Sequence, residues 1–477
     1  MNDTITSPLA LAEDTICATA TGTGGAIAIV RISGRQTFSI IDSVFRSRSF
    51  SAALADRRSL HYGTIVAADA ADDTIDEVLL SAFRAPHSYT GEDSAEISCH
   101  ASQYIIRRIL EALLAQGCRM ARPGEFTQRA FLNGKLDLSQ AEAVADLIAA
   151  TNKATHRLAM SQLRGGISGE LSQLREQLLR LTSLLELELD FSDHEDLEFA
   201  DRSELLALAQ TIEAHIARLA RSFETGQALK QGIPVAIVGK TNVGKSTLLN
   251  RLLNEERAIV SDVHGTTRDT IEDTIDIRGV QFRFIDTAGI RQTTDQVEQI
   301  GIRRTYQAIE KARVVLWLLD EEPSREEQQE MAGRCKEKAL IPVINKADTL
   351  PPAFVPSADV LQQPPLLISA KTGQGIDDLD DAIFAAAGIP ELNDDDIVVA
   401  SARHYDILQR AHDSILRVLD GMGGDDSSPF APHPSLPPDL LAEDLRQTID
   451  ILAEITGGQI TPQETLQNIF SHFCVGK

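Results

Sequence analysis

The chain has 477 residues, which is long enough for two to four domains that each have a hydrophobic core. It is strongly acidic, with 45 Lys and Arg residues against 70 Asp and Glu residues. This balance excludes nucleic-acid binding by overall charge, so any RNA contact needs a local basic patch or a partner.

The cysteine content and the hydropathy also exclude several classes of protein. Five Cys residues are widely spaced and form no C-x-x-C pair, which argues against a disulfide framework or a zinc site. No apolar run approaches the roughly 20 residues of a membrane span. The N-terminus shows no secretory signal. We therefore expect a cytoplasmic protein without membrane contact.

Residues 1–134 are expected to form an α+β domain. Apolar runs at 26–32 and 77–83 predict strands, and residues 104–114 have the periodicity of a helix. Between 101 and 135, six basic residues stand against two acidic ones. Such an excess either binds an anionic ligand or is simply a basic surface.

Residues 135–229 are expected to form the first part of an all-α helical bundle domain. Ser139 and Glu142 have the spacing of a capping box, and the chain from 139 to 228 has almost continuous helical character. Within it, residues 171–181 repeat apolar positions at intervals of three and four, as bundle helices do.

Helical character returns in residues 389–477, with helices expected at 404–419 and 440–456 and a loop rich in Gly and Pro between them. Two helical segments thus flank the block 230–388. We expect this block to be an α/β domain that is inserted into one helical domain.

The block 230–388 alternates apolar strands with helices and contains a phosphate-binding motif. Residues 239–246 match G-x-x-x-x-G-K-[ST], after an apolar run at 234–238 and before helix-like residues 247–253. Backbone N–H groups of such a loop surround phosphates. Lys245 should reach the β- and γ-phosphates, and Ser246 should bind Mg²⁺.

A second motif selects the base. Asn345-Lys346-x-Asp348 follows the apolar run 340–344. The Asp348 carboxylate can accept two hydrogen bonds from the N–H edge of guanine, which adenine does not offer, and the Lys346 stem can lie along the base. Backbone groups of residues 369–371 should complete the contact. The order and spacing of these motifs favour an inserted P-loop (Ras-like) G domain over chance matches.

The region between the motifs should sense the γ-phosphate. Thr267 is the expected second Mg²⁺ ligand, Asp286 should support the Mg²⁺ shell, and the Gly289 N–H can contact the γ-phosphate. Ras-like GTPases orient water with a Gln after this glycine, whereas Ile290 occupies that position here.

Another group must then assist hydrolysis. The Asn242 side chain could hold a monovalent cation beside the phosphates, with carbonyls from 261–265, and Glu298 could orient water. Alternatively, Asn242 is an ordinary loop residue, Glu298 is a solvated helix residue, and Arg291 stabilises charge.

Several strings together resemble the TrmE-type (MnmE) family of tRNA-modification GTPases over essentially the whole chain. They are Arg31-Ile-Ser-Gly34, Thr90-Gly-Glu-Asp93, Arg122-Pro-Gly-Glu-Phe126, Phe131-Leu-Asn-Gly-Lys135, Gly265-Thr-Thr-Arg-Asp269 and Cys474-Val-Gly-Lys477. The resemblance implies an N-terminal folate-binding and dimerising domain. It also implies joint action with the FAD-containing flavoprotein MnmG, as a heterotetramer, on carbon-5 of the wobble uridine (U34) of certain tRNAs. The tRNA is bound through that complex, and the one-carbon unit comes from formyl- or methylene-tetrahydrofolate.

The resemblance also implies site residues. Folate contacts fall on Arg31, Glu96, Lys135 and Lys477, K⁺ ligands on Asn242, Ser261, Val263 and Thr266, and Mg²⁺ ligands on Ser246 and Thr267. Catalytic roles fall on Lys245, Thr267 and the water-positioning Glu298, and Cys474 is a candidate in tRNA modification. The expected GTP and GDP contacts are Asn242, Val243, Gly244, Lys245, Ser246, Thr247, Ser261, Asp262, Val263, His264, Gly265, Thr266, Thr267, Asp286, Thr287, Ala288, Gly289, Asn345, Lys346, Asp348, Ser369, Ala370 and Lys371.

The alternative is a GTP-switched ribosome-assembly factor without a modification role. Such GTPases share the Asn-containing phosphate loop and the Ile at the position of Ile290. They usually add an RNA-binding module or a second G domain. This chain has one set of G motifs and an acidic C-terminal half, which favours the modification GTPase.

Overall fold

The computed structural model describes residues 14–22, 24–48, 58–67, 73–190, 202–257, 273–285, 306–351, 354, 364–390, 396–422, 437–458, 466, 469–470, 473 and 476. They fall into two compact units. The first comprises Met1–Ile148, Gln162–Ala209 and Asp413–Lys477, and the second comprises Ala149–Ser161 and Gln210–His412. None of the described helices is both long enough and apolar enough to cross a membrane.

The first unit contains a seven-stranded sheet in the order β3-β4-β5-β6-β2-β1-β7. All neighbouring strands are antiparallel except β1 and β7, which are parallel. The strands are β1 (Ile16–Thr19), β2 (Ile27–Ser33), β3 (Phe45–Arg46), β4 (Arg58–Val66), β5 (Thr74–Phe83), β6 (Ser94–His100) and β7 (Arg119–Met120). The strands predicted at 26–32 and 77–83 are confirmed as β2 and β5.

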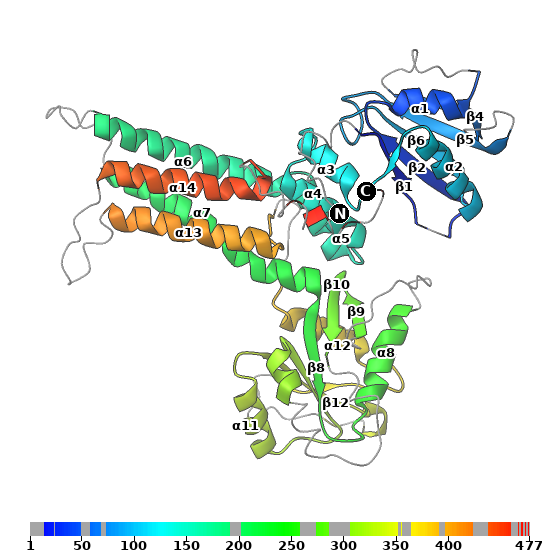
Figure 1. The fold of residues 1–477 in the computed structure, drawn as a ribbon. Coiled ribbons are helices and arrows are strands. Elements are labelled where there is room, and N and C mark those ends of the chain that lie inside the picture. Colours follow the sequence, from blue (N-terminus) through cyan, green and yellow to red (C-terminus); the bar gives the residue numbers. More distant parts are fainter. Residues whose placement is uncertain are drawn as a thin grey trace, which may run out of the picture. The chain divides into compact units, whose positions relative to one another are not determined.

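Helices α1 (Thr37–Val44) and α2 (Gln103–Ala115) cover one face of this sheet (Figure 1). The helix predicted at 104–114 is confirmed as α2. Alternate strand residues such as Val30 and Leu80 point into the core beneath these helices, as the two-residue period of a strand requires. The α+β character predicted for this region is therefore confirmed.

The other face of the same sheet carries large apolar side chains that the described residues leave exposed. Tyr62 on β4 lies opposite Leu79 on β5, and these two side chains are 62% and 44% exposed. Leu60 and Ile27 are 65% and 67% exposed. One face of the sheet thus packs into the core, while the described residues leave large apolar side chains exposed on the other face.

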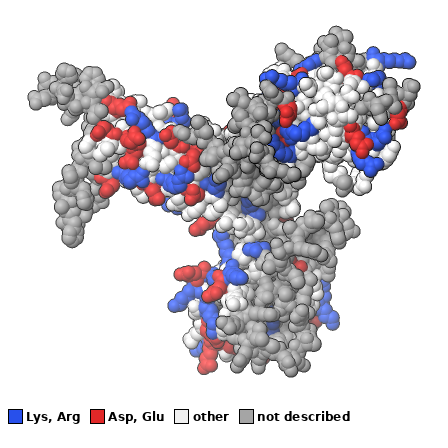
Figure 2. Space-filling view, viewed as in Figure 1, with Lys and Arg blue, Asp and Glu red and all other residues white. Residues whose placement is uncertain are grey.

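Helices make up the rest of the first unit. They include α3 (Glu125–Leu132), α4 (Leu138–Ala149) and the long pair α6 (Gly166–Asp190) and α14 (Pro438–Thr456), which pack side by side (Figure 1). Arg446 of α14 pairs with Glu186 of α6. Lys and Arg side chains are interspersed with Asp and Glu over these helices (Figure 2). This mixture of signs gives the visible helical face no uniform charge.

The capping box lies two residues before the predicted one. Asp137 Oδ1 accepts a hydrogen bond from the Gln140 N–H at 2.9 Å, and Gln140 Oε1 accepts one from the Asp137 N–H at 3.0 Å. Ser139 lies inside the first turn, where its hydroxyl donates to Asp137 Oδ1. The Asp137-Leu-Ser-Gln140 string has the same spacing as Ser139–Glu142, so the pattern alone did not choose between them.

The second unit contains a six-stranded sheet in the order β13-β12-β11-β8-β10-β9, parallel except for the pair β9–β10. The strands are β8 (Ile233–Val238), β9 (Asp273–Ile277), β10 (Val280–Phe284), β11 (Val314–Leu319), β12 (Ala339–Ile344) and β13 (Leu366–Leu367). β11 was not predicted, although all six of its residues are buried. Buried parallel strands lack the alternation that marks a strand.

Alternate residues of β8 enter two cores, because helices flank both faces of this sheet. Val235 and Ile237 pack with Leu248 of α8 (Lys245–Arg257) and Leu379 of α12 (Ile376–Ala386). Ala236 and Val238 enter the opposite core, against which Met331 of α11 (Arg325–Arg334) packs. This three-layer arrangement confirms the α/β character predicted for this part of the chain, while the bounds 230–388 stay a prediction.

The helical character predicted for 139–228 is confirmed for the described residues, apart from the short connections 150–152 and 164–165. It is divided among α4, α5 (Lys153–Leu163), α6 and α7 (Arg202–Gln231). The predicted C-terminal helices are α13 (Ala402–Gly421) and α14. In the second unit, Phe223 of α7 stacks on Tyr405 of α13 with ring centroids 4.4 Å apart.

Gly226 of α7 allows residues 399–400 to lie directly against the helix. A Cβ atom at this position would lie 2.1 Å from the Val399 carbonyl oxygen. Gly169 of α6 is a natural control, because a Cβ atom there would have no atom within 4 Å. The two glycines therefore differ in contact, although both are in long helices.

We predict that Gly226→Ala lowers the melting temperature of the second unit by about 3–10 °C, because backbone must move to admit the methyl group. Gly169→Ala, in the first unit, should leave the melting temperature of that unit unchanged or raise it slightly, since Ala favours a helix over Gly by about 0.5–1 kcal/mol. Differential scanning calorimetry of the full chain would measure each shift relative to wild type. A second unit that melts at the wild-type temperature in Gly226→Ala would contradict the close approach at Gly226.

Candidate functional site

The phosphate-binding motif forms the turn between β8 and α8. Asn242 and Gly244 adopt left-handed backbone angles, with φ of 64° and 101°, and Lys245 begins the helix. The Lys245 ammonium donates hydrogen bonds to the carbonyls of Gly239 at 2.7 Å and Lys240 at 2.6 Å. Burial lowers the pKa of Lys245. The loop therefore curls around a cation at a helix N-terminus, which is an arrangement suited to phosphate.

The other described residues of the phosphate-binding motif differ in their burial. Val243 is buried in the core of the second unit, while Ser246 is half-buried on the first turn of α8. Asn242 and Thr247 are exposed. Ser246 is therefore partly accessible on the first turn of α8, and Asn242 lies at the surface of the loop.

Asn345 lies at the centre of this site, and its side chain is buried. Its Nδ2 donates to the Val243 carbonyl at 2.8 Å, and its Oδ1 accepts from the Ala370 N–H at 3.0 Å. Gly244 makes the approach possible, because a Cβ atom there would lie 2.2 Å from Asn345 Nδ2. Asn345 therefore links the phosphate loop to the segment expected to contact the base.

Asp348 and Lys346 occupy the turn after β12. Asp348 Oδ1 accepts a hydrogen bond from the Ser369 hydroxyl at 2.7 Å, which fixes the carboxylate beside the 369–371 segment. Lys346 has a left-handed φ of 63°, and its ammonium lies 2.9 Å from Asp320. The motif residues for base recognition are thus brought together with the phosphate loop.

Arg251 of α8 also contacts this segment, although the sequence analysis did not identify it. Its guanidinium donates to the carbonyls of Ala370 at 3.2 Å and Lys371 at 2.5 Å. An Arg six residues after the motif lysine matches no motif, so only its helical position and the path of the 369–371 segment could have indicated this contact.

The remaining candidates of the nucleotide site lie outside the described residues. These are Ser261, Asp262, Val263, His264, Gly265, Thr266, Thr267, Asp286, Thr287, Ala288, Gly289 and Glu298, and their roles stay predictions. Cys474 and Lys477 in the other candidate site also lie outside the described residues.

In the first unit, the structure brings Arg31 together with Glu96. These residues are directly opposite on β2 and β6, and Arg31 donates to Glu96 Oε1 at 2.9 Å. Arg31 also lies 3.3 Å from the Gly476 carbonyl, so the C-terminal segment contacts this site. The guanidinium is 5.5 Å from the ring centres of both Tyr89 and Phe126. A charged pair and two aromatic rings thus converge here.

Lys135 lies against a neighbouring segment of the first unit. Its ammonium donates to the Pro86 carbonyl at 3.1 Å, and its stem lies near Gly91. Of the four predicted folate contacts, Arg31 and Glu96 therefore touch one another. Lys135 is placed on the 86–91 segment, which also supplies Tyr89.

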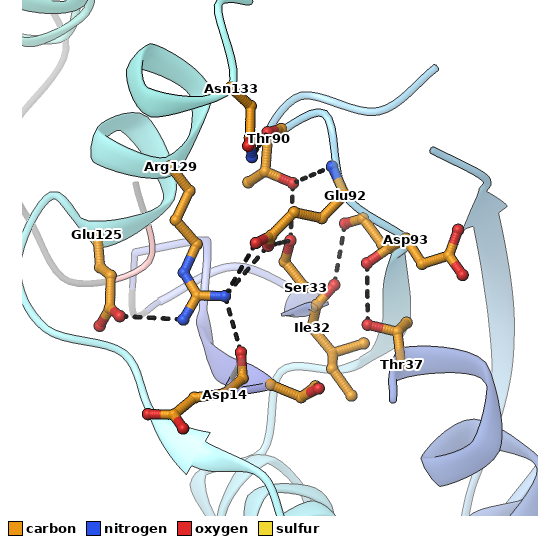
Figure 3. Close-up of polar contacts among 12 residues, drawn as sticks. Asp14, Ile32, Ser33, Thr37, Thr90, Glu92, Asp93, Glu125, Arg129 and Asn133 are labelled. Carbon is orange, nitrogen blue, oxygen red and sulfur yellow. Dashed lines mark hydrogen bonds and ion pairs between the residues drawn. The ribbon is translucent and has the colours of Figure 1, made fainter. Parts of the chain in front are cut away.

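A buried network of charges supports this segment (Figure 3). Arg129 donates to Glu92 at 3.1 Å and to Glu125 at 3.2 Å, and its side chain is only 4% exposed. Glu92 also accepts from Ser33, whose hydroxyl lies 2.7 Å from that of Thr90. The network ties α3 to the 88–93 segment and to β2.

Glu125 carries a charge in spite of its burial. Burial by itself would raise the pKa of Glu125, but hydrogen bonds from Arg119 and from the Arg122 N–H, with the charges of Arg119 and Arg129, lower it to about 2. The basic excess at 101–135 is therefore partly used within the fold. Arg108 likewise pairs with Asp73. The six basic residues between 101 and 135 therefore do not form one free anion-binding patch.

Two family models match the chain. One is described as "MnmE helical domain" and matches residues 138–474, and the other as "GTP-binding protein TrmE N-terminus" and matches residues 15–135. Among solved structures, the G domain of the T. maritima FeoB iron transporter covers 32% of this chain at 19% identity. Its TM-score of 0.23 is too low to support a shared fold.

Curated relatives match over nearly their whole length, and each is described as "tRNA modification GTPase MnmE". The relative from Phocaeicola vulgatus is 50% identical, covering 98% of this chain and 99% of the relative. Those from Bacteroides thetaiotaomicron and Parabacteroides distasonis are 50% and 51% identical, covering 98% and 97% of this chain and all of each relative. On these matches, the chain belongs to the MnmE (TrmE) family.

Proposed function

We propose that this protein hydrolyses GTP in the course of tRNA modification. It adds an aminomethyl or carboxymethylaminomethyl group to carbon-5 of the wobble uridine (U34) of certain tRNAs. The observation that carries the proposal is the bridge made by Asn345, which joins the phosphate loop to the 369–371 segment. This bridge aligns the groups for phosphate with those for guanine, and the relatives' name, tRNA modification GTPase, supports a link between GTP hydrolysis and tRNA modification.

Guanine selectivity would come from Asp348, which the Ser369 hydroxyl holds in place. A carboxylate that is already oriented loses little freedom when it accepts the two N–H groups of guanine. Adenine offers no such pair of donors. ATP would therefore bind poorly, because adenine would leave the Asp348 carboxylate without hydrogen-bond donors.

Two cations complete the proposed site. Ser246, with Thr267, would hold Mg²⁺, and Asn242, with Ser261, Val263 and Thr266, would hold K⁺. The exposed position of Asn242 in the loop fits this role. Positive charge at that point would stabilise the charge that develops on the phosphates during hydrolysis. Glu298 would orient the attacking water in place of the Gln that Ile290 replaces.

The first unit would bind formyl- or methylene-tetrahydrofolate and form a homodimer. The Arg31–Glu96 pair offers a donor and a carboxylate beside the rings of Tyr89 and Phe126, which suits a flat heterocycle with N–H groups. The exposed apolar face that includes Leu79 would be buried between two copies. Lys135 and Lys477 would contribute the remaining folate contacts.

The tRNA would be held through a heterotetramer with the FAD-containing flavoprotein MnmG. The net charge of −25 disfavours tRNA binding by this chain alone. The pairing of Arg119 and Arg129 with Glu125 and Glu92 further limits the cations available for phosphate contacts. Cys474 is the residue of the C-terminal motif that we propose for a role in the modification.

A strain without this gene should lose the carbon-5 modification of U34, as should a strain without the flavoprotein gene. Mass spectrometry of digested tRNA would show the loss. The wild-type gene should restore the modified nucleoside, whereas Lys245→Ala should not. Unchanged wobble uridines in the deletion strain would exclude the modification role, and a change in only one of the two strains would exclude joint action.

The cation proposal predicts that Asn242→Ala, or replacement of K⁺ by Na⁺, lowers the rate of GTP hydrolysis by roughly 10²-fold, because charge stabilisation is lost. The affinity for GDP should change less than the hydrolysis rate, since the bridge made by Asn345 uses the Val243 backbone carbonyl and not the Asn242 side chain. Phosphate release and fluorescent-nucleotide titration would measure the two quantities. A hydrolysis rate indifferent to both changes would refute the K⁺ site.

Two variants on one sheet separate folate binding from dimerisation. Arg31→Ala should abolish the binding of 5-formyl-tetrahydrofolate in calorimetry, because Glu96 loses its partner. Leu79→Asp should convert the dimer to a monomer in light scattering, because it places a charge in an apolar interface. A dimer that persists in Leu79→Asp, or folate binding that survives in Arg31→Ala, would count against the corresponding assignment.

A further inference from the structure

Arg251 closes a ring of contacts around the nucleotide site of the second unit. From the phosphate loop, the Val243 carbonyl accepts from Asn345, and Asn345 accepts from the Ala370 N–H. The Ala370 carbonyl accepts from Arg251. Arg251 belongs to α8, the helix that begins at the phosphate-loop residue Lys245. The ring therefore returns to its starting point through contacts within the protein.

The two contacts of Arg251 orient consecutive peptide groups. The side chain donates through Nε to the Ala370 carbonyl at 3.2 Å and through Nη2 to the Lys371 carbonyl at 2.5 Å. Gly373 also lies close to the guanidinium, which is 3.9 Å from the position that a Cβ atom would take. A planar guanidinium that binds two carbonyls restricts the backbone more than one hydrogen bond does.

The segment held in this way follows the short strand β13 and lies beside Asp348. The Ser369 hydroxyl contacts Asp348 and also accepts from the Thr372 N–H at 3.2 Å, and the Ser369 N–H donates to Gln374. The segment thus forms a tight turn whose outer carbonyls point to α8. Its remaining backbone groups are those available to the base.

We propose that Arg251 is a positioning residue for guanine recognition. It holds the 369–373 turn, before nucleotide binds, in the conformation that presents its backbone groups to the base. The inference rests on the proposed function, because it takes GTP and GDP as the ligands. A turn that is ordered in advance has less conformational entropy to lose on binding, so the benefit should appear as affinity. The hydrogen bonds of Arg251 to Ala370 and Lys371 both lie in this turn, so we expect its loss to change nucleotide affinity more than the chemical step.

The test compares Arg251→Met with Arg251→Lys. Both side chains are long and flexible, but only Lys can donate to the two carbonyls. Arg251→Met should raise the Kd for GDP roughly tenfold, since it removes two charge-assisted hydrogen bonds, and Arg251→Lys should recover much of the loss. Most of the change should be in the dissociation rate of a fluorescent GDP analogue. The kcat for GTP should stay within about twofold of wild type, while KM rises.

Inosine diphosphate provides a second readout, because it lacks the 2-amino group but keeps the other groups of the guanine edge. Arg251→Met should weaken GDP and inosine diphosphate by the same factor. Asp348→Asn should instead change the ratio of the two affinities, because Asp348 contacts the 2-amino group in the proposed site. Calorimetry of wild type and both variants with each nucleotide would measure these affinities.

Distinct outcomes separate this inference from the proposed function. A wild-type chain that binds neither GTP nor GDP would refute the proposed function. Wild-type GDP binding together with an unchanged Kd in Arg251→Met would overturn the role of Arg251. A Lys variant as weak as the Met variant would also overturn it, because a general packing defect would then explain the loss. If Arg251→Met does not fold, Arg251→Gln takes its place. This variant keeps one donor group, so its Kd for GDP should lie between those expected for wild type and for the Met variant. A Gln variant with the wild-type Kd would overturn the inference.

Discussion

The buried Asn345 carboxamide is the interaction on which the nucleotide site of the second unit depends. It uses its donor for the Val243 carbonyl and its acceptor for the Ala370 N–H. A carboxamide offers both functions from one planar group, whereas an ionised aspartate at this position would be unable to donate. Replacing the amide would leave a buried peptide group unsatisfied, at a cost of about 1–3 kcal/mol. The absence of a side chain at Gly244 is part of the same contact.

The two candidate sites bind their cationic side chains in different ways. At Lys245, a cation is held by the carbonyls of its own loop, and a phosphate can replace those partners. Near Arg129, cations are matched with buried carboxylates, whose charge burial alone would disfavour. The first arrangement leaves charge available for a ligand, whereas the second uses charge to fix the backbone around Arg31. An acidic chain can therefore bind anionic nucleotides at one place without an overall positive field.

Much of the fold could be predicted from the sequence, because the informative signals were local. β8, β12, α13 and α14 carry clear apolar patterns and lie where they were expected. The phosphate loop and the turn at Asn345 were found through fixed spacings. What could not be predicted depended on pairing between distant residues. The contacts of Arg251 and the pairing of Arg119 and Arg129 with carboxylates are examples, since charge counting along the chain reports neither burial nor partners. Local patterns can also be ambiguous. The overlapping strings 137–140 and 139–142 both have the spacing of a capping box, and only the structure shows that the first one forms it.

The contact between Arg31 and the Gly476 carbonyl joins residues 445 positions apart. The tail lies close to β1 at this point, because a Cβ atom at Gly476 would lie 2.1 Å from the Thr19 carbonyl. Strands β1 and β2 are synthesised long before Gly476. The Arg31 site can therefore reach its final form only when translation has passed residue 476. A chain truncated before that residue would lack the contact, even where its sheet has already formed.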